Sequence, residues 1–410
     1  RTVGDNCYFG VGVKVIGSVR IGNNVTIGAN AVVTHDIPDN AVVGGVPAKK
    51  KKKKKKKKFK KKKIRGGATK RIEYLDAMRG FTILLVVMWH VSYFGLGFDS
   101  SDTFNLQQYV FVPLRMPLFF FVSGFLMYKA AFQWNYSNTA QFLKKKVLVQ
   151  VISPLIFMVA MSLIKGSDIV SALYDPRKGG YWFTFALFEY FLIYIFCQQM
   201  IMAFKMKSMT EDVFHVIVAL IIYLLTVWTF VERFNLDDDL TGALGISNLH
   251  NYVFFIIGTR CRKHQAMLEH LLNTRYFTTT MLSVFIMLLL VPSLDCLSST
   301  IYHLLLSLSG VLCVFSVFHH YQGQFNSNSK VGKSLIFIGR RTLDIYLLHY
   351  FFIYSNLPSV LPNFASLDSP FMEIVVSFAI SVTVVVGCLL VSSVLRSSPI
   401  LAHFLFGQKK

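Results

Sequence analysis

The chain has 410 residues, of which 53% are hydrophobic, and it carries 38 phenylalanines and 18 tyrosines. Such a composition is rare in a soluble globular domain, so we expect mainly a membrane protein. The formal net charge is +22, but 14 lysines stand in one tract from Lys49 to Lys63, and the remaining charge does not indicate nucleic-acid binding. The six cysteines include no Cys-x-x-Cys pair, so we expect neither a disulfide framework nor a metal site.

Residues 1–48 carry a six-residue repeat. An apolar residue recurs at Val3, Phe9, Val15, Ile21, Ile27 and Val33. This period predicts a β-solenoid in which each short strand forms one side of a triangular coil. The segment resembles the C-terminal end of hexapeptide-repeat acetyltransferases, most closely serine O-acetyltransferases. The resemblance implies a left-handed β-helix and a trimer, with the catalytic histidine on earlier coils.

The solenoid segment is short for a stable fold. A solenoid needs about three stacked repeat units to bury a core, and we count fewer than two coils. We therefore expect residues 1–48 to form a truncated fragment that is catalytically inactive and marginally folded.

Residues 49–70 form a lysine-rich segment, which we expect to be a disordered linker because like charges repel and no apolar surface offsets the ordering entropy. Two interpretations stay open. In the first, the tract binds the anionic cytoplasmic leaflet, with a binding free energy of about 1 kcal/mol per basic residue near the surface. Alternatively, it is an accidental fusion of a truncated gene end to its neighbour, which we favour.

Residues 71–410 contain apolar runs separated by polar breaks, and a helix needs roughly 20 apolar residues to cross a bilayer. Ten such runs are centred near Val87, Phe120, Ile156, Leu192, Ile221, Phe254, Phe285, Leu312, Tyr346 and Val384. Basic clusters alternate with aspartate-containing loops, so the positive-inside rule predicts that both termini are cytoplasmic. We expect an all-α polytopic membrane protein of about ten transmembrane helices, with a short left-handed β-helix fragment before it.

The first apolar run carries Arg79 and His90, with ten residues between them. Eleven helical steps of about 100° end roughly 20° past three full turns, so both side chains share one helix face, about 16 Å apart. Ionisable groups in membrane helices are costly and usually functional. This face is therefore our first candidate for the functional site.

Four stretches of residues 71–410 look like the acyltransferase-3 family of integral-membrane O-acyltransferases. They read RIEYLDAMRGFTILLVVMWH, PLRMPLFFFVSGFLMYK, FLKKKVLVQVISPLIF and IGRRTLDIYLLHYFF, and the Arg-x10-His spacing of the first is the most specific. The resemblance implies transfer of an acyl group, commonly acetyl, to hydroxyls of cell-surface glycans, lipopolysaccharide or related acceptors. Most members are bacterial, so it also implies a multi-pass protein of the bacterial inner membrane.

Acyl transfer needs a base for the acceptor hydroxyl and positive groups for the donor. We expect His90 to be the base, or else to carry the acyl group; the alternative is a histidine that only fixes helix packing. Arg79 is expected to bind the phosphates of acetyl-CoA, the alternative being an anchor paired with Asp76. Arg115 should face the bundle interior and hold the acceptor or stabilise an oxyanion, the alternative being a buried ion pair.

Further residues are candidates for donor binding or helix packing on less specific sequence patterns. Lys144, Lys145 and Lys146 read first as positive-inside anchors, and the resemblance adds a role at the donor entrance. The resemblance also centres on Arg340 and Arg341, which we expect to bind the donor. For Ser123 we favour a helix-packing role.

The leading interpretation is a membrane O-acyltransferase that moves acetyl from cytosolic acetyl-CoA to a glycan or lipid-linked saccharide. Two alternatives stay open. Ten helices with a buried arginine and histidine also suit a proton-coupled transporter or exporter. The second alternative is that the N-terminal segment carries the activity, as a cytosolic acetyltransferase tethered to the membrane.

Overall fold

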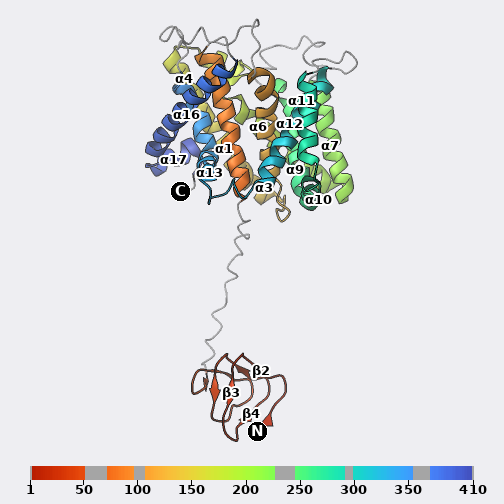
Figure 1. Ribbon diagram of the computed structural model, residues 1–410, viewed down its shortest axis with the longest axis vertical. Helices are drawn as coiled ribbons and strands as arrows, with labels where there is room; N and C mark the ends of the chain where they lie inside the picture. The colour runs from red at the N-terminus through yellow and green to blue at the C-terminus, as the bar shows by residue number, and fades with distance from the viewer. Residues whose placement is uncertain are drawn as a thin grey trace. The chain divides into compact units, whose positions relative to one another are not determined.

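The computed structural model describes residues 2–50, 72–96, 107–226, 245–290, 299–353 and 370–408. The chain divides into two compact units, Arg1–Arg71 and Ile72–Lys410. Figure 1 shows short strands in the first unit and a helix bundle in the second. The lysine tract after Lys50 lies outside the described residues.

The first unit, which we call the strand unit, is a stack of short strands. These are β1 (Thr2–Val3), β2 (Tyr8–Phe9), β3 (Lys14–Val15), β4 (Arg20–Ile21), β5 (Thr26–Ile27), β6 (Val32–Val33), β7 (Val42–Gly44) and β8 (Lys49–Lys50). Parallel pairing joins β1 to β4, β2 to β5 and β3 to β6, with Thr2 opposite Arg20. Because partners lie three hexads apart, the six-residue repeat forms coils of three short strands, as its period predicts.

Burial in the strand unit follows the repeat unevenly. Ile21, Ile27 and Val33 are at most 2% exposed, whereas Val3 is 55% exposed. The core therefore lies in the second coil. The last strand, β8, pairs antiparallel with β7, so ordered structure continues two residues beyond the boundary that the sequence suggested at residue 48.

The second unit, which we call the helical unit, consists of helices in its described residues. Its first elements are α1 (Glu73–His90), η1 (Val91–Gly95), η2 (Gln107–Phe111), α2 (Val112–Met127), α3 (Tyr136–Val147), η3 (Leu148–Ile152), α4 (Ser153–Lys165), α5 (Ile169–Tyr174), η4 (Lys178–Gly180) and α6 (Trp182–Ala203). The later elements are α7 (Ser208–Leu224), η6 (Ile246–Asn251), α9 (Tyr252–Lys263), α10 (Gln265–Leu272), α11 (Phe277–Leu290), α12 (Ser299–His320), α13 (Lys330–Arg340), α14 (Thr342–Leu348), η7 (His349–Phe351), α16 (Pro370–Leu395) and α17 (Pro399–Phe406).

Five helical segments in the described residues are long and apolar enough to cross a membrane. They are Glu73–Gly95, Tyr136–Lys165, Trp182–Ala203, Ile301–His320 and Phe371–Leu395. Val112–Met127 and Phe277–Leu290 are shorter apolar helices. The predicted sixth and ninth runs form α9 and α14, of 12 and 7 residues, which is too short for a full crossing. The described residues thus support a helical membrane protein with five candidate spans, and the predicted count of about ten is not confirmed.

Two helix pairs are held together by close backbone contacts at glycines. On α1 and α13, a Cβ at Gly80 would collide with the carbonyl of Leu335, and one at Gly339 with the carbonyl of Asp76. The pair of α2 and α9 repeats the arrangement, with Gly124 against Phe255. Small residues permit this approach in membrane helices. Each of the first two long helices is therefore closely packed against a partner from the second half of the unit.

π-helical turns interrupt the bundle beside these helices. The turn η1 follows His90 directly, η2 precedes α2, and η3 precedes α4. Pro154 stands at the start of α4, where its missing N–H is tolerated. Such turns are often found at functional sites, because they re-aim nearby side chains.

Candidate active site

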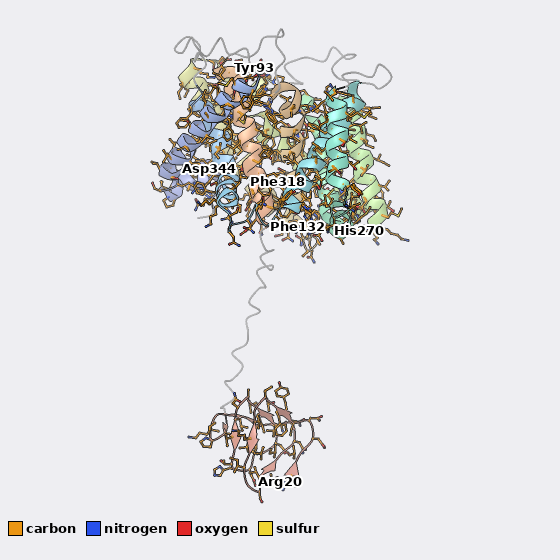
Figure 2. All side chains as sticks on the ribbon, viewed as in Figure 1. Arg20, Tyr93, Phe132, His270, Phe318 and Asp344 are labelled. Carbon is orange, nitrogen blue, oxygen red and sulfur yellow. The ribbon has the colours of Figure 1, made fainter. Side chains whose placement is uncertain are left out.

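Two sizeable cavities lie in the helical unit. The larger, of about 710 Å³, is lined by His90 and Arg115, and we call it the histidine cavity. The other, of about 500 Å³, is lined by Lys145 and Lys146, and we call it the lysine cavity. In Figure 2, Tyr93 of the histidine cavity lies near one end of the bundle and Phe132 of the lysine cavity near the other.

A third cavity, of about 240 Å³, lies between these two, and we call it the middle cavity. It shares four wall residues with the histidine cavity, namely Val86, Met116, Phe183 and Tyr346. It shares four others with the lysine cavity, namely Arg79, Ser123, Gln150 and Leu187. The three cavities therefore follow one another through the bundle.

One face of α1 lines the whole series. Arg79, Ile83, Val86 and His90 succeed one another at helical spacing along its wall. The face predicted from the Arg-x10-His spacing is thus the face that the structure turns to the cavities, with Arg79 towards the lysine cavity and His90 in the histidine cavity. The helices α2 and α6 also contribute residues to the wall of each of the three cavities.

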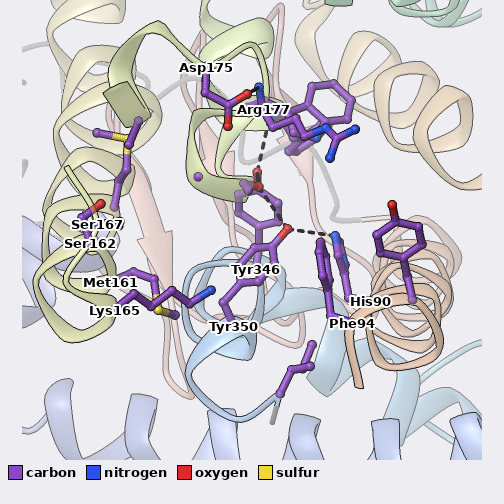
Figure 3. Close-up of a pocket in the computed structure, with 18 of the residues that line it drawn as sticks. His90, Phe94, Met161, Ser162, Lys165, Ser167, Asp175, Arg177, Tyr346 and Tyr350 are labelled. Carbon is purple, nitrogen blue, oxygen red and sulfur yellow. Dashed lines mark hydrogen bonds between the residues drawn. The ribbon is translucent and has the colours of Figure 1, made fainter. Parts of the chain in front are cut away.

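His90 is 8% exposed and both of its ring nitrogens are engaged. Nδ1 lies 2.8 Å from the carbonyl oxygen of Val86, and Nε2 lies 2.8 Å from the hydroxyl of Tyr350. A carbonyl only accepts, so Nδ1 carries the proton in the neutral ring and Nε2 accepts from Tyr350. The nitrogen that could act as a base is therefore Nε2, which Figure 3 shows facing Tyr350 in the cavity.

Tyr350 is held by a glycine loop on the opposite wall. Its hydroxyl also lies 3.3 Å from the carbonyl oxygen of Gly180, which accepts a second bond of 3.0 Å from Tyr346. Gly180 has a φ of +100°, and a Cβ there would collide with the ring of Tyr350. A glycine is therefore required at this position, and the η4 loop fixes the partner of His90.

Arg115 enters the histidine cavity from α2 and is 8% exposed. Its guanidinium carbon lies 3.8 Å from the centre of the Trp89 ring. Within the described residues no carboxylate lies within ion-pair distance, and Nε and Nη1 have no hydrogen-bond partner. The buried ion pair considered from the sequence is therefore absent from the described part of the chain.

The lysine cavity collects basic residues that are open to solvent. Lys129 and Lys145 are exposed, and Lys146 places its ammonium 3.9 Å from the Phe191 ring centre. Arg79 lines this cavity, as expected for a donor-binding residue. It also lies 3.8 Å from Asp76, which is the pairing considered as the alternative. Lys144 is in none of the three cavities.

Arg340 and Arg341 also lie off the three cavities and are engaged in ion pairs. Arg340 is 3.4 Å from Asp76, and Arg341 is 3.3 Å from Asp344, which Arg396 also binds. Their expected donor role therefore has no geometric support here. Sequence reasoning missed Tyr350 and Gly180, because residues separated by 170 or more positions carry no local signal of contact.

A separate polar cluster joins the start of α7 to the end of α9. Arg260 bonds Glu211 at 3.0 Å and Asp212 at 2.8 Å, and Lys263 bonds both carboxylates. Burial alone would raise the pKa of each carboxyl group, but the hydrogen bonds from Lys263 and Arg260 outweigh it and hold both pKa values below their usual range. These charges are paired, unlike that of Arg115.

Comparison with known proteins identifies the helical unit. A family model described as an acyltransferase domain, the acyltransferase-3 family, matches residues 72–393. This match covers most of the chain, and the protein belongs to this family. It is therefore an acyltransferase, and its candidate spans make it a membrane protein. No solved structure matches the chain.

The strand unit has a different set of relatives. A model described as bacterial transferase hexapeptide (six repeats) matches residues 2–35. The serine acetyltransferase of Mycobacterium tuberculosis is 52% identical over 48 residues, which is 12% of this chain and 21% of that protein. The galactoside O-acetyltransferase of Lactococcus lactis is 54% identical over 43 residues, 10% of this chain and 21% of that protein. The chain thus spans about a fifth of the length of these curated relatives.

Proposed function

We propose that the protein transfers an acetyl group from acetyl-CoA to a hydroxyl of a glycan, with the reaction centred on His90. The observation that carries the proposal is the series of three cavities along α1, which leads from solvent-exposed basic residues to a buried histidine. Membership of the acyltransferase-3 family supports the reaction type. The acetyl group, the CoA donor and the glycan acceptor are the proposed parts.

The donor enters through the lysine cavity. Its phosphates meet Arg79, Lys129, Lys145 and Lys146, which lie around one cavity whose described wall residues include no acidic side chain. The thioester arm passes the middle cavity, whose wall is mainly apolar, with Ile83, Phe119 and Leu187 among its residues. The acyl carbon then reaches the vicinity of His90.

The acceptor enters the histidine cavity, and His90 acts as the general base. Its Nε2 takes the proton of the acceptor hydroxyl, whose oxygen attacks the thioester carbon. The carbon–sulfur bond breaks, and the departing thiolate receives the proton from His90. For this the acceptor hydroxyl displaces the Tyr350 hydroxyl from Nε2, while the carbonyl of Gly180 offers Tyr350 a second acceptor.

We further propose the topology that the basic loops predict. The lysine cavity opens to the cytoplasm, where acetyl-CoA is found, and the histidine cavity opens to the other side of a bacterial inner membrane. Both termini are then cytoplasmic. The proposed count of about ten membrane passages includes shorter helices such as α9, which would cross only in part.

The test is transfer of labelled acetyl from acetyl-CoA to the glycan fraction of membranes that contain the full chain. We expect His90→Ala to lower transfer by about 100-fold or more, because it removes the base. The control is His270→Ala, an exposed histidine on α10 outside the three cavities. Equal transfer by the parent and His90→Ala, at equal protein level, would contradict the proposal.

A further inference from the structure

Arg115 is a buried cation whose charge nothing in the described structure compensates. It is 8% exposed, and its Nε and Nη1 have no hydrogen-bond partner. Arg260 is buried to the same extent, yet it bonds Glu211 and Asp212. An unpaired buried charge is strongly destabilising, which is why buried arginines normally have anionic partners. The pairing of Arg260 shows that this chain follows the rule elsewhere.

The histidine cavity has acidic residues, but they are engaged by the backbone. Asp168 caps α5 by accepting from the amides of Val170 and Ser171, at 3.3 Å and 2.8 Å. Asp175 accepts from the amide of Arg177 at 3.0 Å. The same cavity is lined by Lys165, which Figure 3 shows directed into it, and by Arg177. Among the described residues of this wall, the three cationic side chains Arg115, Lys165 and Arg177 thus outnumber the two aspartates.

Trp89 fixes the guanidinium of Arg115 in one place. The 3.8 Å separation between guanidinium carbon and ring centre is that of a close cation–π contact. A stacked guanidinium keeps its in-plane donors available, and these suit the planar carboxylate or the phosphate group. Arg115 and His90 both line the histidine cavity and neither the middle nor the lysine cavity, so Arg115 lies in the cavity that we propose for the acceptor.

We infer that the acceptor is anionic: it carries a phosphate or carboxylate group that Arg115 binds in the histidine cavity, beside the hydroxyl presented to His90. That the bound anion belongs to the acceptor rests on the proposed function. The anion site itself rests only on the unpaired burial of Arg115, its place in the cavity wall and the engagement of both aspartates. A binding measurement can therefore test it without any transfer reaction.

Binding is measured first, on the purified full chain, by tryptophan fluorescence, to which Trp89 and Trp182 of the histidine cavity contribute. Titration with inorganic phosphate or glucose 6-phosphate should give a saturable change, and glucose alone should give none. Arg115→Gln should weaken the phosphate response by about 10- to 100-fold, as expected for loss of a charged hydrogen-bonding partner. Arg115→Lys should retain part of the response, and Trp89→Phe should reduce the amplitude of the signal, because Trp182 also lines the cavity.

The control for binding is Arg275→Gln, which removes one exposed positive charge outside the three cavities. It should leave the titration unchanged. A response to glucose equal to that to glucose 6-phosphate, or an Arg115→Gln titration like that of the parent, would overturn the anion site. If Arg115→Gln does not fold, a titration of Arg115→Lys indistinguishable from that of Arg275→Gln and the parent has the same meaning.

Transfer is measured next, with glucose, glucose 6-phosphate and glucuronic acid as hydroxyl acceptors. The anionic acceptors should show the lower KM, and comparison of the two separates phosphate from carboxylate. Arg115→Gln should raise KM for the anionic acceptors by about 10-fold or more, with little change for glucose. An equal loss of kcat for all three acceptors would instead assign Arg115 to the thioester oxyanion and overturn the inference. Phosphate binding without transfer to any acceptor would leave the anion site standing and contradict the proposed function.

Discussion

The histidine cavity and the lysine cavity hold positive charge in opposite ways. Lys129 and Lys145 of the lysine cavity are exposed, so water compensates them. In the histidine cavity Arg115 is buried and unpaired within the described residues, beside a histidine whose nitrogens are both engaged. Solvated cations suit capture of a large phosphorylated group, whereas desolvated ones suit recognition and chemistry at short range. This difference is what the proposed function requires, with donor binding at the solvated end of the series and transfer at the buried end.

The largest expected effect comes from closing the passage between these cavities. Ser123 lines both the middle and the lysine cavity. Ser123→Phe should fill this point and lower transfer by about 100-fold or more, because the thioester can no longer reach His90. Ser123→Ala is the matched control and should retain transfer. Full activity of Ser123→Phe would show that the donor does not use this route.

The second prediction tests the partner of His90. Tyr350→Phe removes the hydroxyl that bonds Nε2, and Gly180→Ala displaces the same ring. We expect each to lower kcat by roughly 10- to 50-fold, because the Tyr350 hydroxyl orients the His90 ring until the acceptor displaces it, with little change in KM for acetyl-CoA. A pH–rate profile provides the second measurement, since a change in the partner of His90 should move its acidic limb. Unchanged profiles for both variants would remove Tyr350 from the mechanism.

The third prediction concerns the lysine cavity. The double variant Lys145→Gln with Lys146→Gln should raise KM for acetyl-CoA about 10-fold at low salt. The increase should shrink at high ionic strength, where surface charges are screened. Lys144→Gln is the matched control, because Lys144 lies outside the three cavities. The prediction fails if Lys144→Gln has the same effect as the double variant.

A smaller effect is expected at the paired cluster, which serves as a reference for compensated charges. The pKa values of Glu211 and Asp212 are held below their ordinary values, so their contribution to stability is complete above about pH 4.5. It is lost as the pH falls through the lowered pKa values. Thermal unfolding from pH 6 to pH 3 should show this loss, and Asp212→Asn should reduce the slope below about pH 4. A steeper slope in the variant would contradict the assignment.

The smallest expected effect is that of removing the strand unit. All residues that line the three cavities belong to the helical unit. Deletion of residues 1–63 should therefore leave acetyl transfer within about twofold of the parent, a change comparable to that of an exposed substitution. A large loss, with equal protein in the membrane, would show that the hexapeptide segment contributes to the activity.

The sequence predicted those features that depend on local spacing. Helical periodicity was sufficient to place Arg79 and His90 on one cavity face, and the six-residue period was sufficient for the coils of the strand unit. The length of the apolar runs did not predict the length of the helices at α9 and α14, because a hydrophobic run can form short helices separated by turns. Adjacent lysines also differ in direction, so Lys146 reaches the cavity and Lys144 does not.

Long-range partners could not be predicted from the sequence. Tyr350 meets His90 across 260 residues, and its position depends on the unusual backbone of Gly180. The pairing of Arg396 with Asp344 likewise depends on how α14 and α16 pack, and it adds to the local pair of Arg341 with Asp344. The sequence therefore suggested Arg340 and Arg341 as donor ligands, whereas in the structure both form ion pairs.

The glycine contacts determine which parts of the bundle can move. His90 stands on α1 and Arg115 on α2, and each helix touches its partner through backbone atoms with no side chain between them. Sliding or rotation within a pair would drive a carbonyl into a glycine Cα, so α1 with α13 and α2 with α9 act as two stiff bodies. We therefore expect any widening between the cavities during turnover to displace one helix pair relative to the other.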